Sequence, residues 1–164
     1  WTRLRQTAQQ LGQTVSPDDA YLASRGLRTL SVRMKAHEAS ALQIAKWLQT
    51  QPDVAGVFHP ALPECPGHDI WKRDFSGSAG LFSFIHKGDA TTAAAFVDAL
   101  ELFGIGYSWG GFESLALPVQ PEKYRSVVSW DKEGTLIRLQ IGLEDTDDLI
   151  ADLDQAFTVA RSGA

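Results

Sequence analysis

The chain has 164 residues, of which 44% are hydrophobic and 21% are charged, and its formal net charge is -5 at pH 7. This length and hydrophobic content are enough for one domain with a substantial core. Because lysine and arginine are not in excess, the chain is poorly suited to neutralising a row of phosphates or the surface of an anionic bilayer. We therefore expect neither a nucleic acid nor a membrane as a partner.

The cysteine content and the first residues of the chain indicate the cellular compartment in which it is expected. Cys65 is the only cysteine, so the sequence offers no internal disulfide and no zinc half-site of two cysteines. This favours a reducing compartment, and we expect the cytoplasm. The sequence has no apolar run long enough to span a membrane, and its opening residues lack the apolar stretch of a secretory signal. The chain begins within a predicted helix and without methionine, from which we expect a fragment of a longer polypeptide.

The first third of the chain is predicted to be helical. Residues Trp1–Leu11 read as the end of a helix, and Gly12 supplies the left-handed residue that commonly terminates one. The stretch Ser16–Asp19 predicts a new helix, because it combines a serine cap, a proline in the first turn and two acids. We expect Gly26 to interrupt this helix and a long amphipathic helix to follow over Leu27–Gln51. Its apolar positions are Leu27, Leu30, Met34, Ala41, Ile44, Ala45 and Leu48.

The middle of the chain alternates strand and helix signals. Val54–His59 is predicted as a short strand, and the prolines and glycine of Pro60–Gly67 predict a loop after it. Ala79–His86 is almost entirely apolar and is predicted as a central strand. The alanine-rich stretch Ala90–Leu102 follows as a predicted helix, and Gly104–Gly111 is predicted as a glycine-rich turn region.

The last part of the chain predicts a strand and a closing helix. Over Thr135–Gly142 the side chains alternate: Ile137, Leu139 and Ile141 share one face, and Leu136, Arg138 and Gln140 share the other. A final helix is expected to begin near Asp145 or Thr146 and to pack through Leu149, Ile150, Leu153, Ala156 and Phe157. The whole order predicts an α/β two-layer domain, in which a small, mostly antiparallel sheet carries helices on one face.

The histidines and the cysteine do not predict a metal site. His59, Cys65 and His68 lie close together in sequence, but their spacing matches no zinc-ligand pattern and prolines constrain the loop between them. His37 is expected on a helix and His86 at the end of a strand, where solvated or core-edge histidines are ordinary.

The glycine-rich stretch Gly104–Gly111 has Tyr107, Ser108 and Trp109 at its middle. It departs from a phosphate-binding loop, because the glycine spacing differs and no Gly-Lys-Ser or Gly-Lys-Thr ending follows. Tyrosine and tryptophan exposed on a turn usually contact something. From the residues alone, a binding role and local packing both stay open.

Arg138 has two interpretations. An arginine in an alternating strand most often faces solvent and lays its aliphatic stem on apolar neighbours. If the mixed face of the strand borders a cleft, its planar guanidinium is suited to holding a carboxylate through two parallel hydrogen bonds. Both interpretations stay open at this point.

Several segments together resemble the C-terminal half of the Cys/Met-metabolism PLP enzymes. They are Ser24–Leu30, His59–Leu62, Pro66–His68, Trp71–Gly77, Tyr107–Leu115 and Leu136–Asp145. Their order and spacing extend the resemblance over essentially the whole chain. It implies that the predicted fold is the C-terminal domain of a fold-type I PLP enzyme, with residues 1–12 linking from an upstream PLP domain and residues 13–164 forming the domain itself.

The stretch Tyr107–Gly111 resembles the β-eliminating branch of that family. This implies a homotetramer that cleaves the amino acid L-cystathionine to homocysteine, pyruvate and ammonia in methionine biosynthesis. The resemblance also implies substrate-binding roles. Arg138 matches the arginine that holds the substrate α-carboxylate, and Ser108 and Trp109 match residues that line the same pocket. Tyr107 lies beside them and is assigned a mainly structural part.

The lysine that binds the cofactor in this family stands in a Ser-x-Thr-Lys sequence, which the chain lacks. Its lysines are Lys35, Lys46, Lys72, Lys87, Lys123 and Lys132. We therefore expect the catalytic and cofactor-binding residues in the upstream domain, no pyridoxal phosphate bound to this chain alone, and no activity from it alone. A γ-lyase or γ-synthase is the alternative within the class. A binding or assembly module without chemistry is the alternative outside it.

Overall fold

A computed structural model describes residues 1–162 of the chain. The chain forms two compact units, of which the first is Trp1–Arg33 and the second begins at Met34. The first unit is helical, and the second contains a five-stranded sheet. Among the described residues, no helix is both long enough and apolar enough to cross a membrane.

The first unit contains α1 (Thr2–Gln10) and the beginning of α2 (Pro17–Gln49). Gly12 follows α1 with a φ of +66°, the left-handed conformation that the sequence predicts at a helix end. The predicted cap of α2 is confirmed, because the hydroxyl oxygen of Ser16 accepts a hydrogen bond from the Asp19 N–H at 3.1 Å.

The predicted interruption at Gly26 is wrong, because α2 continues through this residue. A glycine inside a helix costs about 1 kcal/mol relative to alanine, but it keeps its N–H and does not break the hydrogen-bond ladder. The Gly26 carbonyl also accepts a hydrogen bond from Nη2 of Arg33 at 2.7 Å. The surrounding helix formers outweigh the cost of one glycine.

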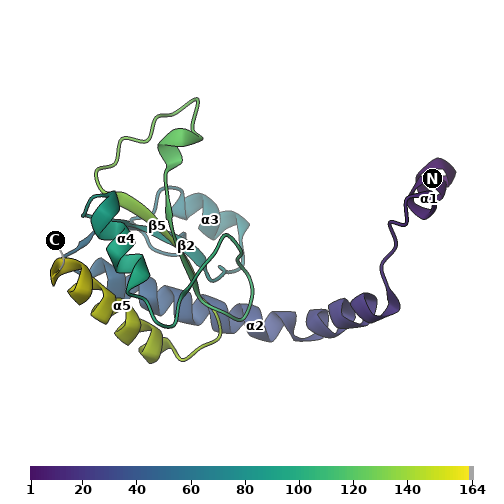
Figure 1. Ribbon diagram of the computed structural model, residues 1–164, viewed down its shortest axis with the longest axis horizontal. Helices are drawn as coiled ribbons and strands as arrows, with labels where there is room; N and C mark the ends of the chain where they lie inside the picture. Colours follow the sequence, from purple (N-terminus) through teal and green to yellow (C-terminus); the bar gives the residue numbers. More distant parts are fainter. Residues whose placement is uncertain (163–164) are drawn as a thin grey trace. The chain divides into compact units, whose positions relative to one another are not determined.

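The sheet of the second unit has the strand order β1-β2-β5-β4-β3, and Figure 1 shows β2 and β5 side by side within it. Its strands are β1 (Val54–Phe58), β2 (Leu81–His86), β3 (Gly104–Ile105), β4 (Leu115–Val119) and β5 (Thr135–Gln140). All neighbouring pairs are antiparallel except β3 and β4. The predicted mostly antiparallel sheet is therefore confirmed, with β5 at its centre.

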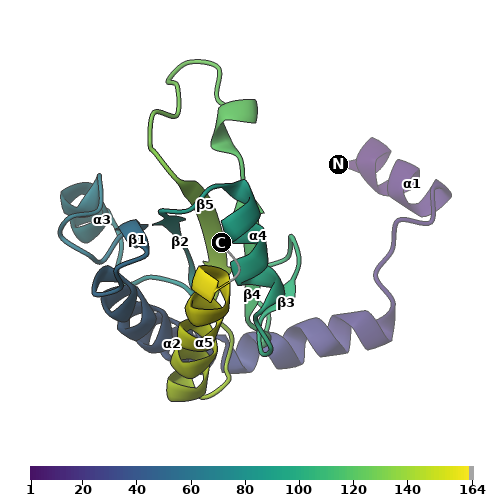
Figure 2. The ribbon, with the colours of Figure 1, turned by 60° about the vertical axis from the view of Figure 1, so that its left-hand side comes forward.

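One face of the sheet carries the hydrophobic core. The second part of α2, α4 (Ala90–Asp98) and α5 (Thr146–Ser162) contribute buried side chains to this core. Phe84 of β2 packs edge-on against Phe96 of α4 and Phe157 of α5. Ile137 and Leu139 of β5 are fully buried in the same cluster. Figure 2 shows α4 and α5 beside the strands they cover, as predicted for a two-layer domain.

Four short elements were not predicted. They are α3 (His68–Asp74), β3, β4, and a 3-10 helix, η1, at Pro121–Lys123. β4 contains Pro118, which argues against a strand in a sequence pattern. In the structure β3 pairs only with Leu115 and Ala116 of β4, so the missing N–H of Pro118 can face the unpaired edge.

Helix α4 is shorter than predicted, because the chain leaves it at Asp98 and is held by a buried carboxylate. Asp152 of α5 accepts hydrogen bonds from the Glu101 N–H at 2.9 Å and the Leu102 N–H at 2.8 Å. The side chain of Gln155 donates to the same carboxylate at 2.9 Å. Asp152 therefore fixes the turn that leads into β3.

We predict that Asp152→Ala destabilises the chain by about 1–3 kcal/mol, because it leaves the partly buried N–H groups of Glu101 and Leu102 without an acceptor. Asp152→Asn should cost less, since one amide oxygen remains to accept. Urea unfolding of the wild type and both variants measures the difference. Equal stability of the alanine variant and the wild type would contradict this role of Asp152.

His86 is buried at the end of β2 and stacks on Phe157 with ring centroids 5.8 Å apart. Its Nδ1 accepts a hydrogen bond from the Gly88 N–H at 2.9 Å. Burial lowers the pKa of His86 from its ordinary value of 6.5, against the opposing charge of Asp53. Burial lowers the pKa of His59 in the same way, against the charge of Glu38.

We predict that the chain loses stability as the pH falls below about 6.5. Below this pH the unfolded histidines bind protons, whereas the folded histidines, with their lower pKa, stay neutral. The stabilising contribution is fully present above that pH and is lost as the pH falls through the lower folded pKa. Urea midpoints at pH 7.5 and pH 5.5 measure the loss. His86→Gln should shrink the difference between the two pH values without abolishing it, since His59 remains. An unchanged difference in this variant would show that His86 is not responsible.

Candidate functional site

The candidate site lies on the face of the sheet opposite the helices. Arg138 of β5 points to this face, because its neighbours Ile137 and Leu139 point into the core. Across the sheet it is paired with Ser83 of β2 and Leu117 of β4. Its side chain is half-buried, so the guanidinium stands on a partly covered surface.

The guanidinium of Arg138 is held by main-chain carbonyls. Its Nη2 donates to the Tyr107 carbonyl at 2.8 Å and to the Gly106 carbonyl at 3.2 Å. The Ser108 carbonyl lies at the limit of hydrogen bonding, at 3.5 Å. Within residues 1–162, Nη1 and Nε donate no hydrogen bond. The two N–H groups of Nη1 and the single N–H of Nε are therefore available to a ligand, and they point to opposite edges of the guanidinium.

These carbonyls belong to a loop that the sheet topology brings to Arg138. We call Gly106–Ser114 the crossover loop, because it connects the parallel strands β3 and β4. A connection between parallel strands must return to the end of the sheet where it started, and so it crosses one face. The hydrogen bonds of Arg138 show that the crossover loop begins on the Arg138 face.

Three predicted site residues follow one another in the crossover loop. Tyr107 and Trp109 are 78% and 63% exposed, and Ser108 is exposed between them. Phe112 of the same loop is 75% exposed. The structure thus brings the main chain of Tyr107 and Ser108 to Arg138, while these side chains are turned to the surface.

Sequence reasoning missed the residues that hold the crossover loop. The main-chain carbonyl of Gly106 accepts a hydrogen bond from Arg138. A main-chain contact of this kind cannot be predicted from a pattern of side chains. Ser114 and Glu144 are joined by two hydrogen bonds. They stand far apart in the sequence, in two separate segments that resemble the family, so only the fold brings them together.

The histidines and the cysteine of the Pro60–Gly67 region organise their own loop. Nδ1 of His59 accepts a hydrogen bond from the Ala61 N–H at 3.2 Å, and Nδ1 of His68 bonds the Pro60 carbonyl at 2.8 Å. Burial raises the pKa of the Cys65 thiol, which disfavours the reactive thiolate. These contacts favour a structural role for the three residues.

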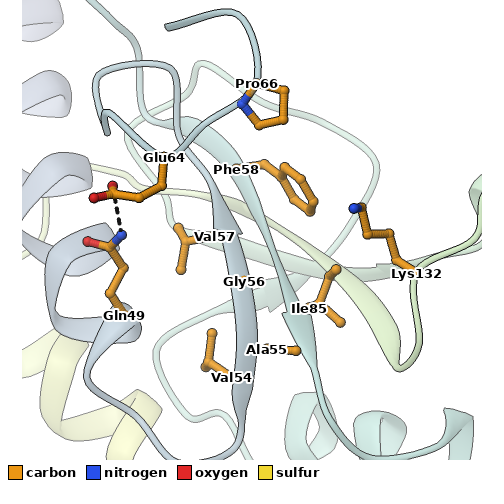
Figure 3. Close-up of a pocket in the computed structure, with 10 residues that line it drawn as sticks. All are labelled: Gln49, Val54, Ala55, Gly56, Val57, Phe58, Glu64, Pro66, Ile85 and Lys132. Atoms are coloured by element: carbon orange, nitrogen blue, oxygen red, sulfur yellow. Dashed lines mark hydrogen bonds between the residues drawn. The ribbon is translucent and has the colours of Figure 1, made fainter.

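A cavity of about 390 Å³ lies elsewhere, beside the edge strand β1 (Figure 3). Its charged lining groups are Glu64, which accepts a hydrogen bond from Gln49 at 3.3 Å, and Lys132. The rest of the lining is mainly the strand itself, with Ile85 of β2. The cavity contains none of the predicted substrate-binding residues, and its polar groups do not converge as those around Arg138 do.

The groups around Arg138 fit a carboxylate. They are a guanidinium with available donors, main-chain carbonyls that fix it, and aromatic side chains in the adjoining loop. The lysines lie in α2, α3 and η1, after β2 and before β5. Within the described residues, no hydrogen bond joins a lysine to Arg138 or to the crossover loop.

Comparison with known proteins identifies relatives of this chain. The profile of the Cys/Met metabolism PLP-dependent enzymes matches residues 1–158. Cystathionine beta-lyase MetC of Escherichia coli (strain K12) is 53% identical over 162 residues, which are 96% of this chain and 41% of that enzyme. Cystathionine gamma-lyase of Mus musculus is 45% identical over 167 residues, 98% of this chain and 42% of that enzyme.

A solved structure shares the fold. It is described as O-acetylhomoserine sulfhydrylase of the methionine biosynthetic pathway of Wolinella succinogenes, and it matches with a TM-score of 0.77 and 32% sequence identity. The match covers 93% of this chain and 41% of that chain. The chain thus spans about two-fifths of the length of these relatives. With the matched profile covering almost its whole length, the chain belongs to the Cys/Met metabolism PLP-dependent enzyme family.

Proposed function

We propose that this chain is the C-terminal part of a PLP-dependent lyase that cleaves L-cystathionine to homocysteine, pyruvate and ammonia. The observation that carries the proposal is the Arg138 guanidinium, which main-chain carbonyls hold on the free face of the sheet with the N–H groups of Nη1 and Nε available. The 53% identity to a cystathionine beta-lyase supports β-elimination over the other reactions of the family.

The reaction needs the substrate to be held at a fixed angle. In β-elimination the Cα proton leaves, the Cβ–S bond breaks, and water releases the remaining carbons as pyruvate and ammonia. When bound, pyridoxal phosphate supplies the electron sink for this chemistry. A guanidinium that holds the α-carboxylate restricts the rotation of the Cα–H bond, and such orientation contributes strongly to rate.

Arg138 is suited to this role because its geometry is fixed before a substrate arrives. Nη2 is committed to the Tyr107 and Gly106 carbonyls, which set the plane of the guanidinium. A carboxylate oxygen then accepts a charge-assisted hydrogen bond from an N–H group that the carbonyls leave available. Lysine cannot replace this group, since an ammonium lacks the planar fork.

The exposed side chains of the crossover loop support the proposed pocket. Ser108 provides a hydroxyl next to the carbonyls that hold Arg138, and Trp109 provides a large apolar surface. We propose that both line the substrate pocket, and that Tyr107 mainly supports the loop. When the rest of the polypeptide covers them, these aromatic groups exclude water from the ion pair between Arg138 and the substrate carboxylate. Exclusion of water strengthens this ion pair.

The proposed partners follow from the same surface. Aromatic residues of the crossover loop are largely exposed, and clustered exposed apolar groups mark interaction sites. We propose that they face the PLP domain of the same polypeptide, that the complete enzyme is a homotetramer, and that it works in the cytoplasm. The second candidate activity is γ-elimination of cystathionine, favoured by the 45% identity to a cystathionine gamma-lyase.

We predict that Arg138→Ala in the full-length enzyme lowers kcat/KM for L-cystathionine by about 30-fold to several thousand-fold, the cost of truncating one partner of a buried charge pair. Arg138→Lys should recover little of this loss. Steady-state kinetics, bound PLP by absorbance and melting temperature are measured together for each variant.

Stability and PLP content should change little in these variants, because Arg138 is outside the hydrophobic core. Ser83→Ala, on the neighbouring strand and the same face, serves as the control. Kinetics within about twofold of wild type for Arg138→Ala, the range of ordinary surface substitutions, would make Arg138 a solvent-facing residue. Analysis of the products separates pyruvate, from β-elimination, from 2-oxobutyrate, from γ-elimination.

We predict that the isolated chain neither binds PLP covalently nor turns over cystathionine, because none of its lysines stands in the Ser-x-Thr-Lys sequence of the family's cofactor lysine. The measurement is visible absorbance after incubation with PLP and dialysis, with free lysine as the control. Absorbance that survives dialysis and is lost on replacement of one lysine of this chain would contradict the prediction.

A further inference from the structure

The far end of the crossover loop is held by a carboxylate. Oε1 of Glu144 accepts a hydrogen bond from the Ser114 N–H at 2.7 Å, and Oε2 accepts one from the Ser114 hydroxyl at 2.8 Å. Ser114 is fully buried, and Glu144 is partly buried. Both bonds are charge-assisted, the stronger class of hydrogen bond in proteins.

The residues next to Glu144 add two further bonds to the same loop. The Gly142 N–H donates to the Ser114 hydroxyl oxygen at 2.8 Å, and the Leu143 N–H donates to the Phe112 carbonyl at 2.8 Å. The contact is close, because a Cβ at Gly142 would collide with the Phe112 carbonyl and the Glu144 carboxylate. Three consecutive residues after β5 therefore bind the end of the crossover loop.

The crossover loop is thus fastened at both ends to one segment of chain. Arg138 in β5 binds its first carbonyls, and Gly142–Glu144 bind its last residues. Within residues 1–162, Glu144 has no cation within salt-bridge distance. The carboxylate therefore acts on the loop through Ser114 rather than through an ion pair.

We propose that Glu144 is a positioning residue, which through Ser114 fixes the crossover loop and thereby the plane of the Arg138 guanidinium. The inference rests on the proposed function for its kinetic readout. Release of the Ser114 end lets the carbonyls of Gly106 and Tyr107 shift, and the guanidinium bonded to them shifts as well. Misplacement of a binding group by about 1 Å can lower the rate about 100-fold.

The test compares Glu144→Ala and Glu144→Gln in the full-length enzyme. Glu144→Ala should raise KM for cystathionine at least about fivefold and lower kcat/KM about 10- to 100-fold per bound PLP. Glu144→Gln should lie between wild type and alanine, because its amide oxygen still accepts from the Ser114 N–H. Glu133→Gln, an exposed glutamate before the other end of β5, is the matched control and should leave kinetics unchanged.

A purely stabilising role of Glu144 makes a different forecast. It would lower the melting temperature and the amount of folded enzyme, but KM and kcat per bound PLP would stay at the wild-type values. That result overturns the proposal. A KM that rises equally in Glu144→Gln and Glu133→Gln would also overturn it, since the effect would then be one of charge alone.

Amide hydrogen exchange tests the proposal without using catalysis. In Glu144→Ala the amides of Ser114, Gly142 and Leu143 should exchange at least about tenfold faster, while amides inside α5 keep their protection. Unchanged exchange at these amides overturns the proposal whatever the kinetics. If the wild-type enzyme proves inactive on cystathionine, the proposed function fails, and hydrogen exchange alone then decides whether Glu144 positions the loop.

Discussion

The alternation of side chains along β5 is the constraint on which both the fold and the candidate site depend. Ile137 and Leu139 point into the core and are fully buried there. The same pleat turns Arg138 to the opposite face, where the crossover loop meets it. A shift of one residue in the pairing of β5 would bury the guanidinium among phenylalanines and expose the two aliphatic side chains. Packing of the core therefore also fixes where the site can form.

The elements that the sequence predicts well carry their signal within a short stretch. The start of α2 follows from the cap formed by Ser16. β5 and α5 follow from the spacing of their apolar residues, which the core then buries. Arg138 is a candidate because it is the charged residue on the mixed face of β5, and the resemblance to the family adds the proposed role in carboxylate binding. The local sequence was enough to predict the two helices and the strand.

The features that the sequence does not predict depend on contacts between distant residues. β4 contains a proline and still pairs with β5. The proline is tolerated because β3 is very short and leaves the last part of β4 unpaired on its other side. Helix α4 ends early because Asp152, far along the chain, binds the turn after it. The bonds between Ser114 and Glu144 are of the same kind. Such pairs have no spacing rule, so the sequence alone does not reveal them.

The central claim is that Arg138, held by the crossover loop, binds the carboxylate of the substrate. A crystal structure of the full-length enzyme with an unreactive amino-acid analogue tests it most directly. The account predicts the analogue carboxylate at about 2.7–2.9 Å from the donors of Arg138 that the loop leaves available, with Nη2 still bonded to the Tyr107 carbonyl. A carboxylate bound by other groups, with Arg138 in contact only with the loop and solvent, would contradict the account.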